Sequence, residues 1–448
     1  MFNLKYNILA SLQIAFTLLN AFLLIKNFGV SSETDAYFML QTIFAAISLL
    51  QYMPVEQFMF FYNDAKKEGK KSAADFYCFS LFVSFATGML FFLCFYFFQD
   101  YVIAFFAYKL DALRLRMLGE FVSIYKWSLF FIPLTYICSS LLNAEMKIGY
   151  SYLVSMLPTV FTVIVQLLLY NCSSPPMIYL VKAGLAGVVT GGLLLLFIVK
   201  IKLGYGVYPI FRHKLSLKYV KNSVAMRFGH NIHSFLFPLA TNNFLSAFPS
   251  GFVSYFYYAQ RIVGILQALI IGPSSRMLQS RIASMWSDNL LGEIKEEVKK
   301  YYKFFSLLFL FSAFICYFAI PFAFEIIASS VPDSGVRHIQ IMFAFLALWS
   351  FVLFIESPFD MILISSKNSR IFMAVNSIFI LTYSLILFFL KNKLGINAIF
   401  MALIIGQSIN FFFYFRGALK VLNLGQKRAI EKVINYVKTR IQHYYPNI

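Results

Sequence analysis

The sequence predicts an all-α polytopic membrane protein of about twelve transmembrane helices, arranged as two pseudo-symmetric six-helix bundles around a central cavity. Three observations support this prediction. Hydrophobic residues make up 60% of the 448 residues, and 55 of them are Phe, which is too apolar for a soluble chain of this length. Apolar runs of spanning length recur along the whole chain. Short motifs of the first half also recur in the second half.

Charged residues, prolines and glycines separate the apolar runs from one another. The first run has no convincing small-residue cleavage site, so we expect it to remain as a span and not to be removed as a signal peptide. We expect spans at about residues 7–26, 36–62, 75–98, 121–142, 150–170, 182–199, 227–248, 251–273, 303–325, 339–364, 370–390 and 395–415.

Basic residues set the predicted orientation. The net charge is +19, and most Lys and Arg residues fall in the segments that lie inside if the N-terminus is cytoplasmic. The sequence therefore predicts a multi-pass membrane protein with an even number of spans and both termini in the cytoplasm. This asymmetry explains the positive charge as topology, so we expect no nucleic-acid partner.

Internal repetition predicts the domain organisation. Matches at similar offsets and in the same order map the first six spans onto the last six, which indicates a parallel repeat with a cavity between the halves. The matches are Ala36-Tyr37-Phe38 with Ser254-Tyr255-Phe256, Lys147 with Lys367, and Lys182 to Gly187 with Lys393 to Ala398. We expect bundles at 1–200 and 227–419, a cytoplasmic interfacial linker helix at 201–226 and a basic amphipathic cytoplasmic tail at 420–448.

Three inner segments have the pattern of interfacial basic helices. They are Arg212 to Asn222, Asp288 to Lys303 and Leu424 to Tyr445. A basic helix at headgroup level fixes orientation without a specific partner, so we assign these segments none.

Arg261 lies at the midpoint of the eighth predicted span. A charge at mid-membrane costs roughly 2.5–3.5 kcal/mol on insertion scales, so such residues face a bundle interior or a hydrated cavity. A guanidinium suits a phosphate because it donates two hydrogen bonds in one plane. Gln260 adds a neutral donor on the same span. The alternative is a structural pair with an acidic residue on a neighbouring helix.

The start of the seventh span is rich in polar side chains. Arg227, His230 and Asn231 lie within about one helical turn and share a face near the predicted cytoplasmic entrance. This face suits the wall of a hydrated, substrate-binding cavity. Packing and interface anchoring explain it equally well.

Glu356 and Asp360 in the tenth span are four residues apart and therefore stack on one helix face. Two close carboxylates are candidates for binding a coupling H⁺ or Na⁺. The alternative is pairing with Lys367 and Arg370 at the inner boundary. We expect no other cofactor.

The first outer turn contains Glu33 and Asp35. Asp35 is a candidate cap of the second helix. The acidic pair also allows a second interpretation, because membrane glycosyltransferases that use lipid-linked sugars hold a metal with acidic residues of their first outer loop. No outer loop here is long, and the sequence lacks HExxH, Ser/His/Asp and phosphate-cradling Gly-rich motifs. The five cysteines are scattered singly. We therefore expect no enzyme, no catalytic residue and no metal site.

Several of these motifs together resemble the multidrug/oligosaccharidyl-lipid/polysaccharide (MOP) exporter superfamily, and within it the lipid-linked oligosaccharide flippases of the Wzx and MurJ kinds. The motifs are Phe28-Gly29 with Asp35-Ala36-Tyr37, Leu142-Asn143-Ala144 and Tyr258-Ala259-Gln260-Arg261. The resemblance implies two six-span halves and places residues like Asp35 and Arg261 in the functional set.

The sequence also departs from the MurJ pattern. The stretch from Gln41 to Val55 has none of the further cavity arginines of MurJ-type proteins, and the chain has a basic tail in place of their two additional C-terminal spans. These departures favour a flippase for a polysaccharide repeat unit over one dedicated to the peptidoglycan precursor lipid II.

The resemblance implies a flippase that translocates a polyprenyl-pyrophosphate-linked glycan across a bacterial cytoplasmic (inner) membrane by alternating access. We expect Arg261, Gln260, Asn231, His230 and Arg227 to replace the hydration of the pyrophosphate. We expect a monomer. The first alternative is a drug or cation antiporter of the same superfamily, and the second is a membrane glycosyltransferase.

Overall fold

The computed structural model describes residues 4–444, apart from 56, 171, 173–175, 231, 272–273, 276–277, 279–280, 283–284, 286–289, 328–330 and 366–368. Within these ranges the regular secondary structure is helical throughout, and no strand occurs among the described residues. The predicted all-α fold class is therefore confirmed.

Contacts divide the chain into two compact units. The first comprises Met1–Arg261 with Pro321–Ile339, and the second comprises Ile262–Ile320 with Gln340–Ile448. The predicted bundles at 1–200 and 227–419 rest on sequence repetition and not on contact density, so they stay a prediction.

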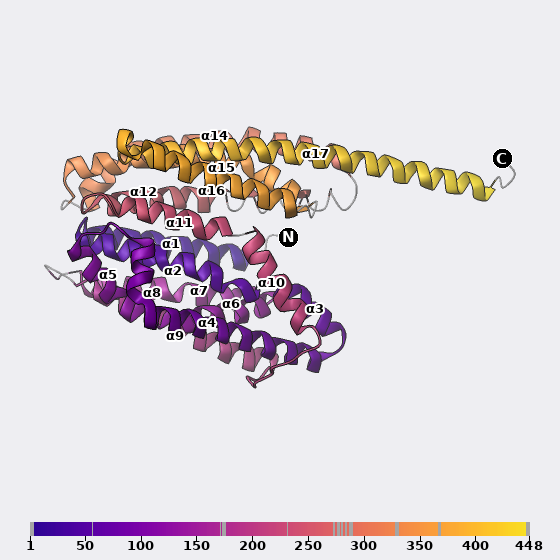
Figure 1. The fold of residues 1–448 in the computed structure, drawn as a ribbon, viewed down its shortest axis with the longest axis horizontal. Helices are drawn as coiled ribbons and strands as arrows, with labels where there is room; N and C mark the ends of the chain where they lie inside the picture. The colour runs from indigo at the N-terminus through magenta and orange to yellow at the C-terminus, as the bar shows by residue number, and fades with distance from the viewer. Residues whose placement is uncertain are drawn as a thin grey trace. The chain divides into compact units, whose positions relative to one another are not determined.

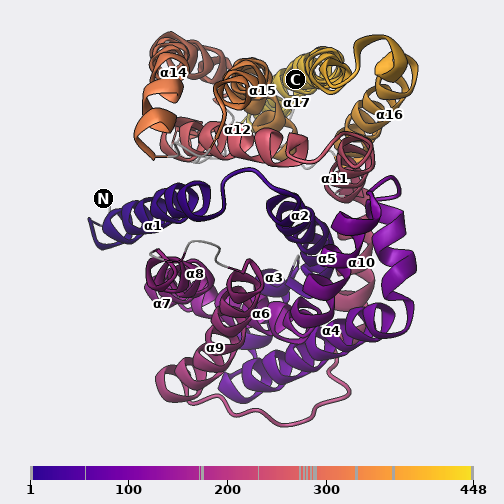
Figure 2. The same ribbon diagram turned by 90° about the vertical axis from the view of Figure 1, so that its left-hand side faces the viewer.

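Most helices belong to the first unit. Figure 2 shows α4, α6 and α9 side by side, while α2 packs against α5 and α11, and α1 against α8. The bounds are α1 (Leu4–Phe28), α2 (Ser32–Gln51), the 3-10 helix η1 (Met53–Val55), α3 (Phe58–Lys67), α4 (Lys70–Phe106), α5 (Ala112–Tyr125), α6 (Ser128–Ala144), α7 (Ile148–Ser155), α8 (Leu157–Leu168), α9 (Ile178–Leu203), α10 (Ser216–His230), α11 (Ile232–Leu245) and α12 (Phe252–Leu266).

The second unit contains the later helices. They are the π-helix η2 (Gln267–Ile271), most of α14 (Leu291–Ile327) and α15 (Asp333–Ser365), α16 (Ser369–Leu394) and α17 (Asn397–Tyr444). Gly395, with φ 53°, follows α16 and lets the chain turn back so that α17 packs along it. Figure 1 shows α17 as one uninterrupted helix up to the C-terminal segment.

The described helices support a polytopic membrane protein. Eight of them qualify as membrane spans by length and composition, or nine if the bent pair α5 and α6 is one span. Most described residues of the twelve predicted runs are helical, although some runs contain more than one helix. The count of eight or nine applies only to the described residues.

The fourth predicted span, residues 121–142, differs most from the structure. It consists of the end of α5 and nearly all of α6, which meet at a bend of 52°. Lys126 and Trp127 separate the two helices, so the charged Lys126 marks the bend within an otherwise apolar run.

Two of the predicted interfacial helices have other boundaries. Gly204, with φ 71°, ends α9, and the chain stays non-helical until α10 begins at Ser216 and continues to His230. The predicted helix Asp288 to Lys303 is not separate, because from Leu291 onward it forms the start of the 37-residue α14. No proline interrupts the hydrogen-bond ladder of α14 before Pro321.

The non-helical linker lies on the ends of α3 and α4. Lys214 forms an ion pair with Glu68, and the Tyr208 hydroxyl donates a hydrogen bond to Asp75 at 2.8 Å. The hydrogen bond and charge of Lys214 lower the pKa of the Glu68 carboxyl. The linker is therefore fixed to the first unit by polar contacts at its surface.

Candidate substrate site

Asp35 is the centre of a buried polar cluster in the first unit. Its side chain has no exposed surface. The Gly251 amide donates to Asp35 Oδ2 at 2.7 Å, and the Ser254 amide and hydroxyl donate to Oδ1 at 2.8 and 2.5 Å. Asp35 therefore caps the N-terminus of α12. The second helix has its own cap, because the Ser31 hydroxyl accepts the Thr34 amide.

Arg114 supplies the positive charge of this cluster. Its Nη1 lies 3.3 Å from Asp35 Oδ2, its Nε 2.6 Å from Asp111 Oδ2, and its Nη2 donates to the Phe248 carbonyl at 2.8 Å. Arg114 is 3% exposed, so both members of the pair with Asp35 are out of water. Burial opposes ionisation of Asp111, but the hydrogen bonds from Arg114 outweigh it and lower the pKa of that carboxyl.

Gly251 is required by the backbone at this point. Its φ of +94° is a conformation that side-chain-bearing residues rarely adopt, and an added Cβ would lie 2.8 Å from Val30 Cγ1. The turn presents the Gly251 amide to Asp35. The beginnings of α2 and α12 are also joined by a hydrogen bond between the Ser32 and Ser250 hydroxyls and by one from Tyr258 to the Gly29 carbonyl.

Arg261 lies further along α12 on the side that meets α2. Its Nη2 donates to Gln41 Oε1 at 2.8 Å, and its guanidinium lies 4.8 Å from the centre of the Phe38 ring. No acidic residue forms an ion pair with it in the described part of the chain. Gln260 is partly buried and makes no hydrogen bond with described residues. The Arg261 charge is therefore held by a neutral amide and an aromatic face.

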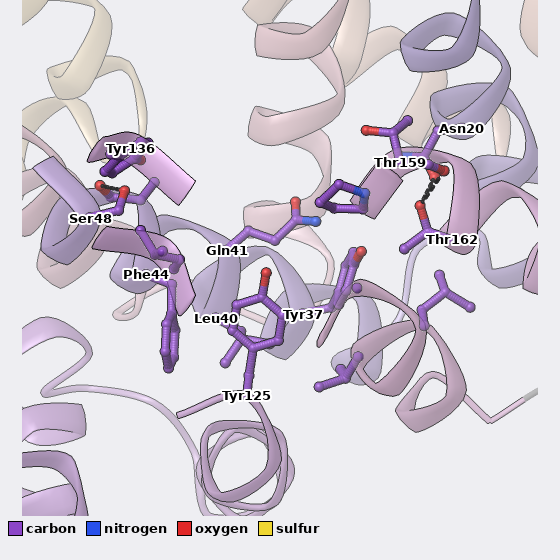
Figure 3. A pocket seen from close by; sticks show the side chains of 16 residues that line it. Asn20, Tyr37, Leu40, Gln41, Phe44, Ser48, Tyr125, Tyr136, Thr159 and Thr162 are labelled. Atoms are coloured by element: carbon purple, nitrogen blue, oxygen red, sulfur yellow. Dashed lines mark hydrogen bonds between the residues drawn. The ribbon is translucent and has the colours of Figure 1, made fainter. Parts of the chain in front are cut away.

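Gln41 connects Arg261 to a cavity of about 280 Å³ within the first unit. Figure 3 shows the Gln41 amide near the centre of this cavity, close to the Tyr37 and Tyr125 side chains. On another side of the cavity, Asn20 Oδ1 accepts hydrogen bonds from Thr162 and Gln166 at 3.0 and 2.6 Å.

Glu356 forms a second buried polar cluster, in the second unit. It is 7% exposed, and Gln407 Nε2 donates to its Oε2 at 2.7 Å. Asn410 Nδ2 lies 3.3 and 3.4 Å from the two carboxylate oxygens. Asp360, one turn later on α15, has a buried Oδ1 without a hydrogen-bond partner in the structure. No described basic residue pairs with either carboxylate.

Some predicted site residues lie outside the description. This holds for all of Asn231 and for the side chains of Arg227 and His230, while the backbone of the latter two belongs to α10. Lys367, a proposed partner of the α15 acids, is also outside it, and so is the Arg370 side chain.

The structure brings together residues that sequence reasoning did not connect. The sequence pattern singles out Gln41 only as the first residue of a stretch without arginine, and it does not single out Arg114. Gln41 lies 220 residues from Arg261 and Arg114 lies 79 residues from Asp35, so no local pattern links them. The repeat of Ala36-Tyr37-Phe38 in Ser254-Tyr255-Phe256 was the available signal, since α2 and α12 meet close to these motifs, where Phe38 contacts the Tyr257 and Tyr258 rings.

The geometry is unfavourable to the metal-dependent glycosyltransferase alternative. Both Asp35 oxygens accept hydrogen bonds from protein groups and pair with Arg114, so Asp35 is not free to hold a metal with Glu33.

A family model for the lipid II flippase MurJ matches residues 24–442 of this chain. The chain belongs to this family. The matched residues include most of both compact units, so the family assignment applies to nearly the whole chain. It confirms the expectation of a flippase for a lipid-linked glycan.

Solved structures agree with this membership at the level of the fold. The lipid II flippase MurJ in an inward closed conformation is 16% identical, with a TM-score of 0.78 over 98% of this chain and 93% of that one. An inward-facing multidrug resistance MATE transporter of the MOP superfamily is 12% identical, with a TM-score of 0.75 over 92% and 96%. A MOP superfamily transporter from Pyrococcus furiosus is also 12% identical, with a TM-score of 0.57 over 94% and 92%. No curated protein sequence matches this chain.

These findings confirm the expected MOP superfamily fold and a multi-pass protein of the inner membrane. MurJ family proteins are transporters, which fits the expectation that this chain catalyses no reaction.

Proposed function

We propose that this MurJ family protein translocates a lipid-linked glycan across the cytoplasmic membrane, and that the glycan is the peptidoglycan precursor lipid II. The family model supports this choice of lipid. The observation that carries the proposal is Arg261, a guanidinium within a predicted span that is bonded to Gln41 and not to an acidic residue in the described part of the chain. A pyrophosphate offers it a stronger acceptor than a neutral amide does.

In the proposed mechanism, side chains of the protein replace the water molecules that hydrate the pyrophosphate. A pyrophosphate cannot leave water for hydrocarbon at a useful rate unless other groups take over its hydrogen bonds. Arg261 donates two such bonds from one plane, and Gln41, once released by Arg261, donates from its amide. The polyprenyl chain remains in the bilayer, and no covalent bond is made or broken.

Asp35 has a different role in this proposal. The topology expected from the basic residues places the beginnings of α2 and α12 at the outer face of the membrane. The hydrogen bonds that Asp35 accepts from Gly251 and Ser254 hold these helix ends together. We infer that they form an outer gate, which must open for the headgroup to leave, so alternating access includes breaking these bonds.

Glu356 and Asp360 are the proposed coupling site. Two carboxylates one turn apart on α15 favour uptake of a cation, and the amides of Gln407 and Asn410 orient Glu356 for it. The ion is H⁺ or Na⁺. Measuring flipping in proteoliposomes with opposed pH and Na⁺ gradients distinguishes the two, and a rate that responds to neither gradient contradicts coupling at this site.

The test of the main proposal is Arg261→Ala in purified protein reconstituted with fluorescent lipid II. We expect flipping to fall by about 10- to 100-fold, because a hydrogen bond to a charged group contributes roughly 1.5–3 kcal/mol. Arg116→Ala is the matched control, since Arg116 is 76% exposed on α5. Normal flipping by Arg261→Ala at equal protein levels rules out the proposed role of Arg261.

The drug antiporter alternative predicts a binding cavity with acidic residues. None of the residues that line the described cavity is acidic. Accumulation of a cationic dye by vesicles that contain the protein, without flipping of lipid II, supports that alternative.

A further inference from the structure

Two helix breaks lie next to each other in the first unit. α4 departs from helical geometry at Phe98, with φ −126° and ψ 27°, and α5 and α6 meet at a bend of 52° across Lys126 and Trp127. The Lys126 ammonium lies 5.2 Å from the centre of the Tyr96 ring, and the centres of the Trp127 and Phe92 rings are 4.7 Å apart. We call Tyr96, Lys126 and Trp127 the bend site.

Helix lengths place the bend site at the edge of the hydrocarbon layer. On the expected topology, α4 runs outward through the membrane and α6 runs inward. Phe76 follows the last charged residue before the apolar part of α4. About 20 helical residues cross ~30 Å of hydrocarbon, and this length, counted from Phe76, ends next to Tyr96. The 17 residues of α6 cover about 26 Å, so Trp127 also lies near the outer edge.

The surface of α4 that leads to the bend site faces lipid. It exposes large apolar side chains, which a hydrated cavity wall would not carry. They are Phe82, Phe85, Met89, Leu90 and Phe97. At the outer end of this surface Tyr96 and Trp127 are 58% and 51% exposed, and these two residue types are enriched where hydrocarbon meets headgroups. The bend site therefore continues the lipid-facing surface up to headgroup level.

Two hydrogen-bond donors of the bend site have no acceptor in the described part of the chain. Among the described carboxylates, neither Asp100 of α4 nor Glu120 of α5 forms an ion pair with Lys126, and Glu120 pairs at 3.6 Å with an arginine of its own helix. The Trp127 indole N–H makes no hydrogen bond with described residues. An ammonium and an indole N–H on consecutive residues suit a phosphate group, because its oxygens accept hydrogen bonds.

We propose that the bend site binds the phosphate group of an anionic phospholipid, such as phosphatidylglycerol, in the outer leaflet. The phosphate accepts hydrogen bonds from Lys126 and Trp127, and an acyl chain lies along the apolar surface of α4. A zwitterionic lipid binds less well, because its own cationic group competes with Lys126 for the phosphate. The site goes beyond the proposed translocation, since its ligand is a lipid of the bilayer that is not transported.

The experiment measures lipid binding to the full-length protein by native mass spectrometry. Phosphatidylglycerol and phosphatidylcholine with identical acyl chains are added separately to the detergent-purified protein, and lipid II is absent. We expect wild type to bind phosphatidylglycerol about fivefold more tightly, which is the upper end for one exposed ion pair. Lys126→Gln should remove this preference, and Lys126→Arg, which keeps the charge, should retain it.

Lys182→Gln is the matched control. Lys182 is also an expected outer lysine above a tyrosine, with its Nζ 5.8 Å from the centre of the Tyr179 ring. Both residues belong to the uninterrupted α9, and no tryptophan neighbours Lys182 in the chain. We expect this variant to keep the preference for phosphatidylglycerol.

Two further measurements test the second donor and the source of the phosphate. Trp127→Phe removes the indole N–H but keeps an aromatic ring against Phe92, so we expect it to reduce the preference about twofold. Inorganic phosphate should not displace phosphatidylglycerol, because a free ion gains nothing from the apolar surface of α4.

The bend site is wrong if wild type has no preference, if Lys126→Gln keeps it, or if Lys182→Gln loses it equally, because the protein then has annular lipid contacts only. An unchanged preference in Trp127→Phe excludes the indole as a donor. Displacement by inorganic phosphate means that the site takes a free anion and not a lipid. Because the assay contains no lipid II, a negative result leaves the proposed function standing.

Discussion

Asp35 and Glu356 are both buried carboxylates in apolar helices, but their surroundings differ. Asp35 accepts bonds from two backbone amides and a hydroxyl and pairs with the buried Arg114. Glu356 is surrounded by the neutral amides of Gln407 and Asn410, with no described basic partner. A buried charge needs compensation. Asp35 has it within the protein, whereas the described neighbours of Glu356 are neutral, which agrees with the proposed gate at Asp35 and the proposed coupling site at Glu356.

The largest expected effect is on the Asp35 cluster. Arg114→Ala leaves an uncompensated buried carboxylate, and breaking such a pair costs about 3–5 kcal/mol. We expect a large drop in the melting temperature of the detergent-purified protein. Arg116→Ala, on the exposed face of the same helix, should change it little. Equal melting temperatures for the two variants indicate that Asp35 is not compensated by Arg114.

Ser254→Ala removes the side-chain donor to Asp35 but keeps the backbone one. Hydrogen bonds to charged groups contribute roughly 1.5–3 kcal/mol, so we expect a loss of stability within that range. Ser408→Ala is the control, because the Ser408 hydroxyl only bonds back to the Ile404 carbonyl of its own helix. The two variants are compared by thermal unfolding, and an equal loss contradicts a special role of Asp35.

Glu356→Gln tests the other side of the comparison. Because Glu356 has neutral partners, the amide keeps its shape and much of its hydrogen bonding, and we expect stability to change by less than about 1 kcal/mol. The dependence of flipping on the H⁺ or Na⁺ gradient should disappear. Asp35→Asn, measured beside it, should destabilise the protein more. The reverse order of melting temperatures means that Glu356 has a fixed countercharge and that the comparison is wrong.

The smallest expected effect is on the surface ion pair between Lys66 and Glu145. Burial opposes ionisation of Glu145, but hydrogen bonds from Lys66 and Tyr62 outweigh it, so the pKa of Glu145 is lowered on folding. The resulting stabilisation is present above the pKa of an unfolded Glu, about 4.3, and disappears as pH falls through the lower folded value. We expect Lys66→Ala to lose about 0.2–1 kcal/mol at neutral pH.

The pH dependence of this loss is the check. Melting temperatures of wild type and Lys66→Ala should converge as the pH falls from 7 through the lowered pKa of Glu145, because the carboxyl becomes protonated and the ion pair is lost. A difference that grows on acidification contradicts the pairing of Lys66 with Glu145.

The sequence by itself determined the membrane class, the helical fold and the order of the helices, because composition and apolar run length report directly on the solvent that the helices face. It also identified Arg261, since a charge in an apolar run is expensive wherever the neighbouring helices lie. The motifs shared with MOP exporters pointed to the superfamily.

Only the tertiary structure decided the partners. The cap that Asp35 provides belongs to α12 and not to its own helix, Arg114 lies 79 residues from Asp35, and Gln41 lies 220 residues from Arg261. Helical periodicity fixes which residues share a face of one helix, but it contains no information about which helices meet. The bend of 52° between α5 and α6 was also decided by the tertiary structure, because the single charged residue Lys126 in the apolar run does not by itself fix the angle between two helices. Long-range packing therefore decided that Asp35 bonds to α12, that Arg261 bonds to Gln41 and that Gln41 lines a cavity without charged residues.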